Sequence, residues 1–132
     1  MRLQVQNPIL PPLFEEAAQQ LFSHLIDPAE VGEALREKVA VEGESLEELL
    51  QNWITTLLDL VRVQHMVFRQ FKIDLKIAEK GPYSLKAEVI GELLDSQRHS
   101  LLQNPAALRC EKVQLDRSGE MYHAEIVLSY GF

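Results

Sequence analysis

Cysteine is scarce in this 132-residue sequence, with a single copy at position 110. One cysteine cannot form an internal disulfide, which excludes the disulfide-stapled folds of small secreted proteins. No apolar run approaches the roughly 20 residues of a membrane span. The chain also opens on the polar stretch MRLQVQN instead of an apolar signal segment. We therefore expect a cytoplasmic protein with no membrane partner and a buried or half-buried, structural Cys110.

Basic residues are also few, because 13 lysines and arginines stand against 20 acidic residues and give a net charge of −7. Residues 15–59 carry eleven acidic and two basic side chains, whereas residues 60–100 carry seven basic and five acidic ones. Nucleic-acid binders normally show a clustered basic face. We expect no direct nucleic-acid binding, and an acidic segment that is a solvated surface or steers a basic partner protein.

The clearest element is a helix over residues 43–62, GESLEELLQNWITTLLDLVR. Its apolar residues recur at the spacing of one broad helical face. They are Leu46, Leu49, Leu50, Trp53, Ile54, Leu57, Leu58 and Val61. Ser45 followed by Glu48 predicts a capping box at the start of the helix. We expect this helix to lie against the core, with Trp53 as an anchor.

The remaining periodicity predicts a second amphipathic helix at residues 12–26 and a series of strands. The predicted strands are residues 1–5, 71–77, 83–89, 108–115 and 121–130. Residues 29–42 fit a helix or a strand, and we favour a strand for the second half because β-branched residues gather there. The polar stretch 92–105 predicts a long loop.

Turn residues join four of these strands into two hairpins. The predicted turns are Lys80-Gly81-Pro82 and Asp116-Arg117-Ser118-Gly119. The alternation breaks near Glu111-Lys112, which predicts a β-bulge. The element order predicts an α+β fold: one two-layer domain over residues 1–132, with two amphipathic helices on one face of a mostly antiparallel sheet.

Three blocks of the sequence resemble segments of the archease family. LFEEAAQQLF at residues 13–22 and LEELLQNWITTLLDL at residues 46–60 are similar to the two family helices. GELLDSQRH at residues 91–99 is similar to a G-E-x-l-D-x-x-r-H segment of the family. Five positions of this block are in register: Gly91, Glu92, Asp95, Arg98 and His99. The likeness covers nearly the whole chain.

The resemblance implies a small α+β protein that acts as a cofactor of the GTP-dependent RNA ligase of tRNA splicing and RNA repair, promoting its guanylylation and turnover. It also implies a chaperone-like role toward other nucleic-acid-modifying enzymes. The family's metal-binding acids come from an H-T-A-D segment and from an aspartate near the end of the last strand. Aligned on the first helix, the H-T-A-D segment would fall before Met1, and Ser129 stands where the aspartate is expected. Because hard cations need several oxygen ligands, usually including carboxylates, we expect neither a metal nor another cofactor.

Five residues are candidates for partner binding, and we expect no catalytic residue and no metal ligand. Four of the candidates, Glu92, Asp95, Arg98 and His99, belong to the GELLDSQRH block, and Arg109 stands at the family's lysine position. For the block, the alternative is a polar loop in which Asp95 caps a turn through its own backbone. For Arg109, the alternative is an ordinary surface arginine.

Two main hypotheses about function follow from these residues, beside a third possibility, a homodimer with a structural function and an apolar interface of roughly 1,000 Å² or more. The first is a non-enzymatic accessory protein that binds an RNA ligase or another nucleic-acid-modifying enzyme, as a monomer or weak homodimer. The alternative is a diverged enzyme or small-ligand-binding protein that uses Arg109 and the loop of Glu92, Asp95 and His99. A concave pocket that gathers those side chains would favour the alternative, and their scatter over the surface would count against it.

Overall fold

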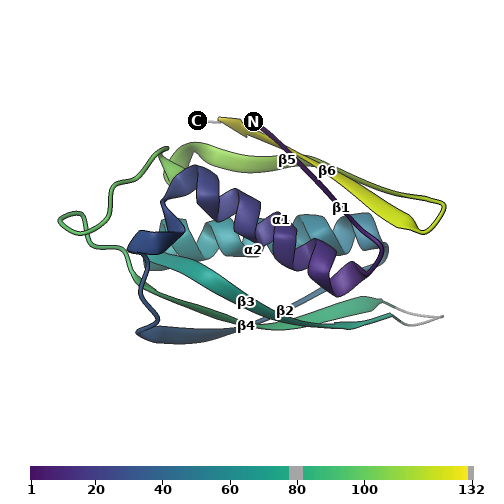
Figure 1. Ribbon diagram of the computed structural model, residues 1–132, viewed down its shortest axis with the longest axis horizontal. Helices are drawn as coiled ribbons and strands as arrows, with labels where there is room; N and C mark the ends of the chain where they lie inside the picture. Colours follow the sequence, from purple (N-terminus) through teal and green to yellow (C-terminus); the bar gives the residue numbers. More distant parts are fainter. Residues whose placement is uncertain (78–81, 131–132) are drawn as a thin grey trace.

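A computed structural model describes residues 1–77 and 82–130 and shows two helices between two three-stranded sheets (Figure 1). Sheet A contains, in order, β1 (Arg2–Asn7), β6 (Met121–Tyr130) and β5 (Leu108–Ser118). Sheet B contains β2 (Leu35–Gly43), β4 (Tyr83–Leu93) and β3 (Met66–Lys76). Neighbouring strands in both sheets are antiparallel. The predicted α+β class, the antiparallel pairing and the two amphipathic helices are confirmed.

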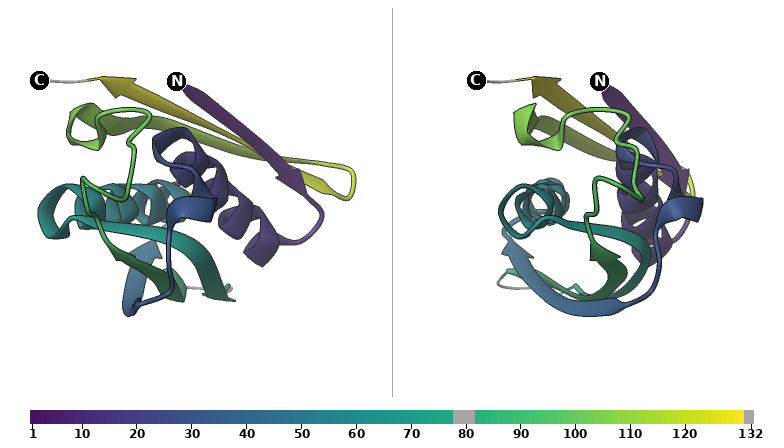
Figure 2. Two further views of the ribbon diagram at one scale, coloured as in Figure 1. Left: turned by 60° about the vertical axis from the view of Figure 1, so that its left-hand side comes forward. Right: turned by 90° about the vertical axis from the view of Figure 1, so that its left-hand side faces the viewer.

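The arrangement of the strands differs from the sequence prediction in one respect. They form two sheets, one on each side of the helices, instead of a single sheet with the helices on one face (Figure 2). α1 (Leu10–Leu25) packs against β1 and β3, and α2 (Leu46–Gln64) packs against β2 and β5. Alternation shows which face of a strand is buried, but it does not show which strands share a sheet.

The long helix α2 begins and ends with well-defined caps. The Ser45 hydroxyl accepts a hydrogen bond from the Glu48 backbone N–H at 3.1 Å, which confirms the serine half of the predicted capping box. His65 ends the helix in the left-handed conformation, with φ at 54°. Trp53 is fully buried, and its indole Nε1–H donates to the Phe14 carbonyl at 3.1 Å. The predicted role of Trp53 as a core anchor is confirmed.

Helix α1 begins two residues earlier than the sequence predicted, at Leu10. Pro11 and Pro12 therefore lie in its first turn, where their missing N–H groups leave no hydrogen bond unmade. Before the helix, the Asn7 side chain accepts from the Ile9 backbone N–H at 2.9 Å. The side-chain oxygen of an asparagine thus sets the turn that separates β1 from α1.

Strand β2 confirms the strand predicted in the second half of residues 29–42, and a short 3₁₀ helix, η1 (Pro28–Glu30), precedes it. Strand β4 runs on to Leu93, so the prediction that places Glu92 in a loop is wrong. Glu92 pairs with Val67 of β3, and this extra pairing carries the strand past Gly91. The loop itself covers residues 94–104 and is followed by a second 3₁₀ helix, η2 (Pro105–Ala107).

Two irregularities interrupt the strand pairing. The register of β5 and β6 shifts between Cys110 and Lys112, which confirms the predicted bulge. A second shift, between Phe68 and Gln70 in β3, had no signal in the sequence. Of the predicted turns, the second is tighter than expected because β5 continues to Ser118. Positions 80 and 81 of the first turn lie outside the described residues.

The core lies between the two sheets, and aromatic rings fill its centre. The Phe22 and Phe68 ring centroids are 5.6 Å apart, and those of Trp53 and Phe71 are 6.2 Å apart. Both pairs meet edge to face, which is a favourable arrangement of the ring quadrupoles. Among the helices of the described residues, none combines the length and apolar character that crossing a membrane requires.

Candidate partner-binding site

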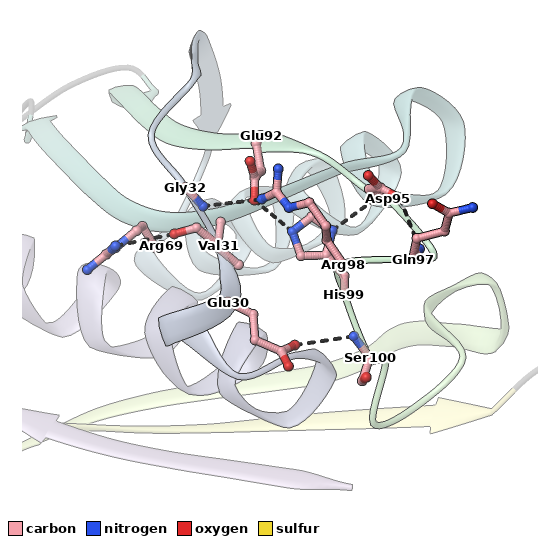
Figure 3. Close-up of polar contacts among 10 residues, drawn as sticks. All are labelled: Glu30, Val31, Gly32, Arg69, Glu92, Asp95, Gln97, Arg98, His99 and Ser100. Atoms are coloured by element: carbon pink, nitrogen blue, oxygen red, sulfur yellow. Dashed lines mark hydrogen bonds and ion pairs between the residues drawn. The ribbon is translucent and has the colours of Figure 1, made fainter.

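Two connecting segments lie side by side at one end of sheet B, and four of the five candidate residues are found there (Figures 2 and 3). One segment, residues 26–34, joins α1 to β2, and the other is the loop of residues 94–104. The Leu102 backbone N–H donates to the Leu25 carbonyl at 2.8 Å. The Ser100 backbone N–H donates to Oε2 of Glu30 at 3.2 Å. The loop is therefore tied to the end of α1 through Leu25 and to the 26–34 segment through Glu30.

The centre of the site is the carboxylate of Glu92, which is only 7% exposed. Its Oε1 atom accepts from the Gly32 backbone N–H at 2.9 Å, from Nη2 of Arg98 at 2.5 Å and from Nε2 of His99 at 2.7 Å (Figure 3). These four residues, Gly32, Glu92, Arg98 and His99, form what we call the Glu92 cluster. One buried oxygen thus joins β4 to both connecting segments.

The Glu92 carboxylate stays ionised in spite of its burial. The hydrogen bond from Gly32, followed by those from Arg98 and His99, lowers the pKa of Glu92 from its ordinary value of 4.5 to about 2. Burial acts in the opposite direction but is outweighed by these donors. The hydrogen bond to Glu92 and the charge of its carboxylate raise the pKa of Arg98, so the pair is an ion pair at neutral pH.

The hydrogen bonds of His99 fix its tautomer. Nδ1 lies 2.8 Å from the Asp95 backbone N–H, which donates to it, so Nδ1 carries no proton. Nε2 must then carry the proton and donate to Glu92. The ring is neutral, its side chain is fully buried, and both nitrogens are occupied. In this arrangement His99 supports the loop and offers no free nitrogen to a metal or a substrate.

Asp95 shapes the turn that carries Arg98 and His99. Its Oδ1 accepts from the Gln97 backbone N–H at 2.9 Å, and its carbonyl accepts from the N–H groups of Arg98 and His99 at 3.1 and 2.7 Å. This is the turn-capping role that the sequence offered as the alternative for Asp95. Arg98, by contrast, keeps 57% of its side chain exposed while it contacts Glu92. It is the cation of this block, and its charge reaches the surface.

Two glycines allow the close approaches on which the site depends. A Cβ atom at position 91 would lie 1.8 Å from the Val67 carbonyl oxygen, next to the bulge in β3. A Cβ atom at position 32 would lie 3.0 Å from Oε2 of Glu92. Gly91 belongs to the block that the sequence singled out, whereas Gly32 was missed. A lone glycine in an irregular segment is too common to signal a contact 60 residues away.

Arg69 is a second residue that the sequence analysis missed. It lies at the bulge of β3, and its Nη1 donates to the Val31 carbonyl at 3.2 Å. The bulge turns this side chain toward the 26–34 segment. No pattern in the sequence marks the bulge, because the polar pair Arg69-Gln70 also fits an ordinary strand end.

Arg109 lies apart from the other four candidates. It is exposed on β5 of sheet A, directly opposite Ser129 of β6. In the part of the chain that the structure describes, it shares no hydrogen bond or ion pair with the Glu92 cluster. Its neighbour Cys110 is half-buried against the core, and burial raises the pKa of this thiol to about 11. Cys110 is therefore a poor nucleophile at neutral pH.

The residues around Ser129 do not fit the metal that the family resemblance implies. Ser129 offers a neutral hydroxyl where a carboxylate is needed, and the residue opposite it is the cation Arg109. Within residues 1–77 and 82–130, no group of three or more His, Cys, Asp and Glu side chains is arranged to hold a metal ion. The donor set of this chain thus disagrees with the family's metal site.

The geometry of the site is also relevant to the alternative of a diverged enzyme or small-ligand-binding protein. A shallow hollow beside the loop is lined by Leu35, Glu92, Asp95 and Arg98 among others. Inside it, Oε1 of Glu92 already accepts from three donors, and the His99 ring is shielded from solvent. Arg109 is on the other sheet. Of the four side chains named by that alternative, Glu92 and Asp95 line this hollow, whereas His99 and Arg109 do not.

The family model that matches the chain and the individual relatives that it resembles carry the same family name. The model of the Archease protein family (MTH1598/TM1083) matches residues 1–128. The chain is 34% identical over 104 residues to the protein archease of Pyrococcus abyssi, covering 79% of this chain and 72% of that protein. It is 32% identical over 117 residues to the protein archease of Methanosarcina acetivorans, covering 88% and 80%.

A solved structure has the same fold. The solution structure of protein 1598 of Methanobacterium thermoautotrophicum matches with a TM-score of 0.70 at 20% sequence identity. The match covers 95% of this chain and 88% of that one. At this identity the likeness concerns the fold alone.

Proposed function

Because this chain belongs to the archease family, we propose that it is an accessory protein without catalysis of its own, and that it assists a partner enzyme. The partner we propose is the GTP-dependent RNA ligase of tRNA splicing or another nucleic-acid-modifying enzyme. The observation that carries the proposal is the Glu92 cluster. Oε1 of its buried carboxylate and both nitrogens of its imidazole, the groups best suited to acid-base chemistry, are used in holding two segments together.

The partner-facing part of the site, in this proposal, is the loop of residues 94–104. The exposed Arg98 guanidinium lies on this loop, and Leu101 and Leu102 are 40% and 63% exposed. Leu93, the last residue of β4, is 59% exposed beside them in the sequence. A cation flanked by exposed leucines is a composition typical of protein interfaces, in which arginine is enriched and apolar side chains are buried on binding.

We further propose that this member works without the family's metal. Ser129 and Arg109 support this, since a hydroxyl facing a guanidinium is a poor environment for a divalent cation. Isothermal titration with calcium and magnesium tests the idea, and the expected result is no saturable binding. Binding with a Kd below about 100 μM, lost on Ser129→Arg, would refute it.

The accessory role is tested by combining the purified chain with the RNA ligase of its host. We expect a complex in a pull-down and faster transfer of GMP onto the ligase when the chain is added. Arg98→Glu should reduce the stimulation about 10-fold, because it places a repelling charge at the proposed contact. Lys112→Glu makes the same charge change on the exposed side of β5 in sheet A and serves as the matched control.

Each outcome of this assay has a definite meaning. No complex and no stimulation would remove the proposed function. Stimulation that Arg98→Glu leaves intact would keep the function but move the contact away from the loop. If Arg109→Glu reduces the stimulation and Arg98→Glu does not, the contact lies on sheet A.

A further inference from the structure

The outer face of sheet B, the face turned away from the helices, gathers basic side chains that are scattered in the sequence. Alternate residues of β2, β3 and β4 are buried against the core, and the residues between them point outward. The outward cations are Arg36, Lys38, Lys72, Lys76 and Lys86, and we call this surface the basic sheet face. All five side chains belong to exposed residues.

The strand register brings these cations into rows across the sheet. In the strand register, Glu88 of β4 lies directly opposite Lys38 of β2 on one side and Lys72 of β3 on the other. Since neighbouring strands are about 4.8 Å apart, the backbones of the two lysines are roughly 10 Å apart. In the next row Lys86 lies between Ala40 and Asp74. The small Ala40 side chain leaves a hollow of about 470 Å³ that the three lysines border.

The charge of this face is opposite to that of the molecule. Five cations stand against three outward carboxylates, Glu42, Asp74 and Glu88, in a chain of net charge −7. Glu88 is already paired with Arg36, whose Nη1 donates to it at 2.8 Å. The outer face of sheet A carries fewer cations, since Arg2, Arg109 and Lys112 stand against Asp116 and Glu125. Of the two outer sheet faces, sheet B thus carries the larger group of cations in an acidic protein.

The mixture of charges indicates the kind of partner that fits. A phosphate backbone would be repelled by the interspersed carboxylates, and the outward positions of β2, β3 and β4 that the structure describes include no aromatic ring on which bases stack. A protein surface rich in carboxylates can instead meet the lysines while its own cations meet Asp74 and Glu42. Along the same side of β4, Glu88 is followed by the buried residues Ile90 and Glu92, so the exposed face ends next to the candidate site.

We propose that the basic sheet face is a docking surface for a carboxylate-rich patch on the partner enzyme. This inference rests on the proposed accessory function and names the second contact that the partner makes. The loop of residues 94–104 supplies the arginine and apolar contact, and the basic sheet face supplies the electrostatic one. Such a face speeds association and selects the partner by charge, so the complex depends on ionic strength.

Two double variants with equal charge change test the proposal in the complex with the ligase. Lys38→Glu with Lys72→Glu reverses the two cations that flank Glu88 in sheet B. Arg2→Glu with Lys112→Glu reverses the two cations that flank Val127 at the corresponding place in sheet A. We expect the sheet B variant to raise the Kd at least ~10-fold and the sheet A variant to change it less than ~2-fold at low salt. Equal effects, or a larger effect from sheet A, would overturn the proposal.

A second measurement decides the proposal even if no complex with the ligase forms, an outcome that would remove only the proposed function. The ¹⁵N-labelled chain is titrated with a glutamate-rich peptide and, separately, with an RNA oligonucleotide of the same length. The proposal expects the peptide to shift amide signals of β2, β3 and β4 and not those of β1, β5 and β6, with the shifts abolished in the Lys38→Glu, Lys72→Glu variant. Shifts spread over both sheets, or tighter binding of the RNA than of the peptide to sheet B, would refute it.

Discussion

Glu92 is the single residue whose loss should affect the site most, because one of its oxygens accepts from three donors on two segments. Glu92→Gln keeps the shape but removes the charge, and its amide cannot satisfy all three donors. We expect the free energy of unfolding to fall by about 1–3 kcal/mol, measured by urea denaturation. Glu88→Gln is the control, since Glu88 makes a surface ion pair with the largely exposed Arg36, worth about 0–1 kcal/mol. Equal losses in the two variants would contradict the central role of Glu92.

The same residue predicts a pH dependence. Because the pKa of Glu92 is about 2 in the folded protein and 4.5 is its ordinary value, the unfolded chain binds a proton first as the pH falls. The stability that Glu92 contributes is complete above pH 4.5 and is lost as the pH falls toward 2. The difference in unfolding free energy between the wild type and Glu92→Gln should therefore shrink over this range. A difference that stays constant would show that the carboxylate is not held ionised.

At the scale of the elements, the meeting of β3 and β4 depends on Gly91. Gly91→Ala would place a methyl group 1.8 Å from the Val67 carbonyl, a backbone atom that cannot turn aside. We expect a loss of more than about 2 kcal/mol in unfolding free energy, because the strands must separate at the bulge. Gly119→Ala is the comparison: its φ is +63° but nothing lies within 4 Å of the added atom, so the loss should be about 1 kcal/mol. The reverse order would mean that the bulge adapts easily.

The helices and most strands could be predicted from the sequence because each has a period of its own. The apolar stripe of α2 and the alternation of β6 require one buried face and nothing else. The bulge at Arg69 and the extension of β4 through Glu92 could not be predicted in this way. They depend on contacts with residues 26–34, and no local pattern encodes a carboxylate that becomes buried because distant donors surround it.

At the scale of the molecule, the helix layer joins the two sheets into one cooperative unit. Both helices contact both sheets, and one apolar cluster includes residues from β1, β6, β3 and β4. We expect urea unfolding followed by Trp53 fluorescence, which reports on the buried layer, to coincide with unfolding followed by far-ultraviolet circular dichroism. Separate midpoints would show that one sheet melts before the other.

Part of the candidate site could be predicted from the sequence, and the fold of the whole molecule explains why the rest could not. Four of the five residues come together because they lie within eight positions of one another along β4 and its loop. Their roles were not predictable, since burial separates Glu92 and His99 from the exposed Arg98. Arg109 was grouped with them through the family resemblance, and the topology puts it on the opposite sheet. That arginine stays a separate partner-binding prediction.

The two ends of the described chain have a practical consequence. The Met1 carbonyl accepts from the Leu128 backbone N–H at 2.8 Å, so both ends emerge together on sheet A (Figure 1). Figure 1 shows sheet B on the far side of the helices from these ends. A biotin or an affinity tag attached at either end would anchor the molecule to a sensor chip through one broad side. The basic sheet face would then point toward the flowing solution, where a partner protein could reach it.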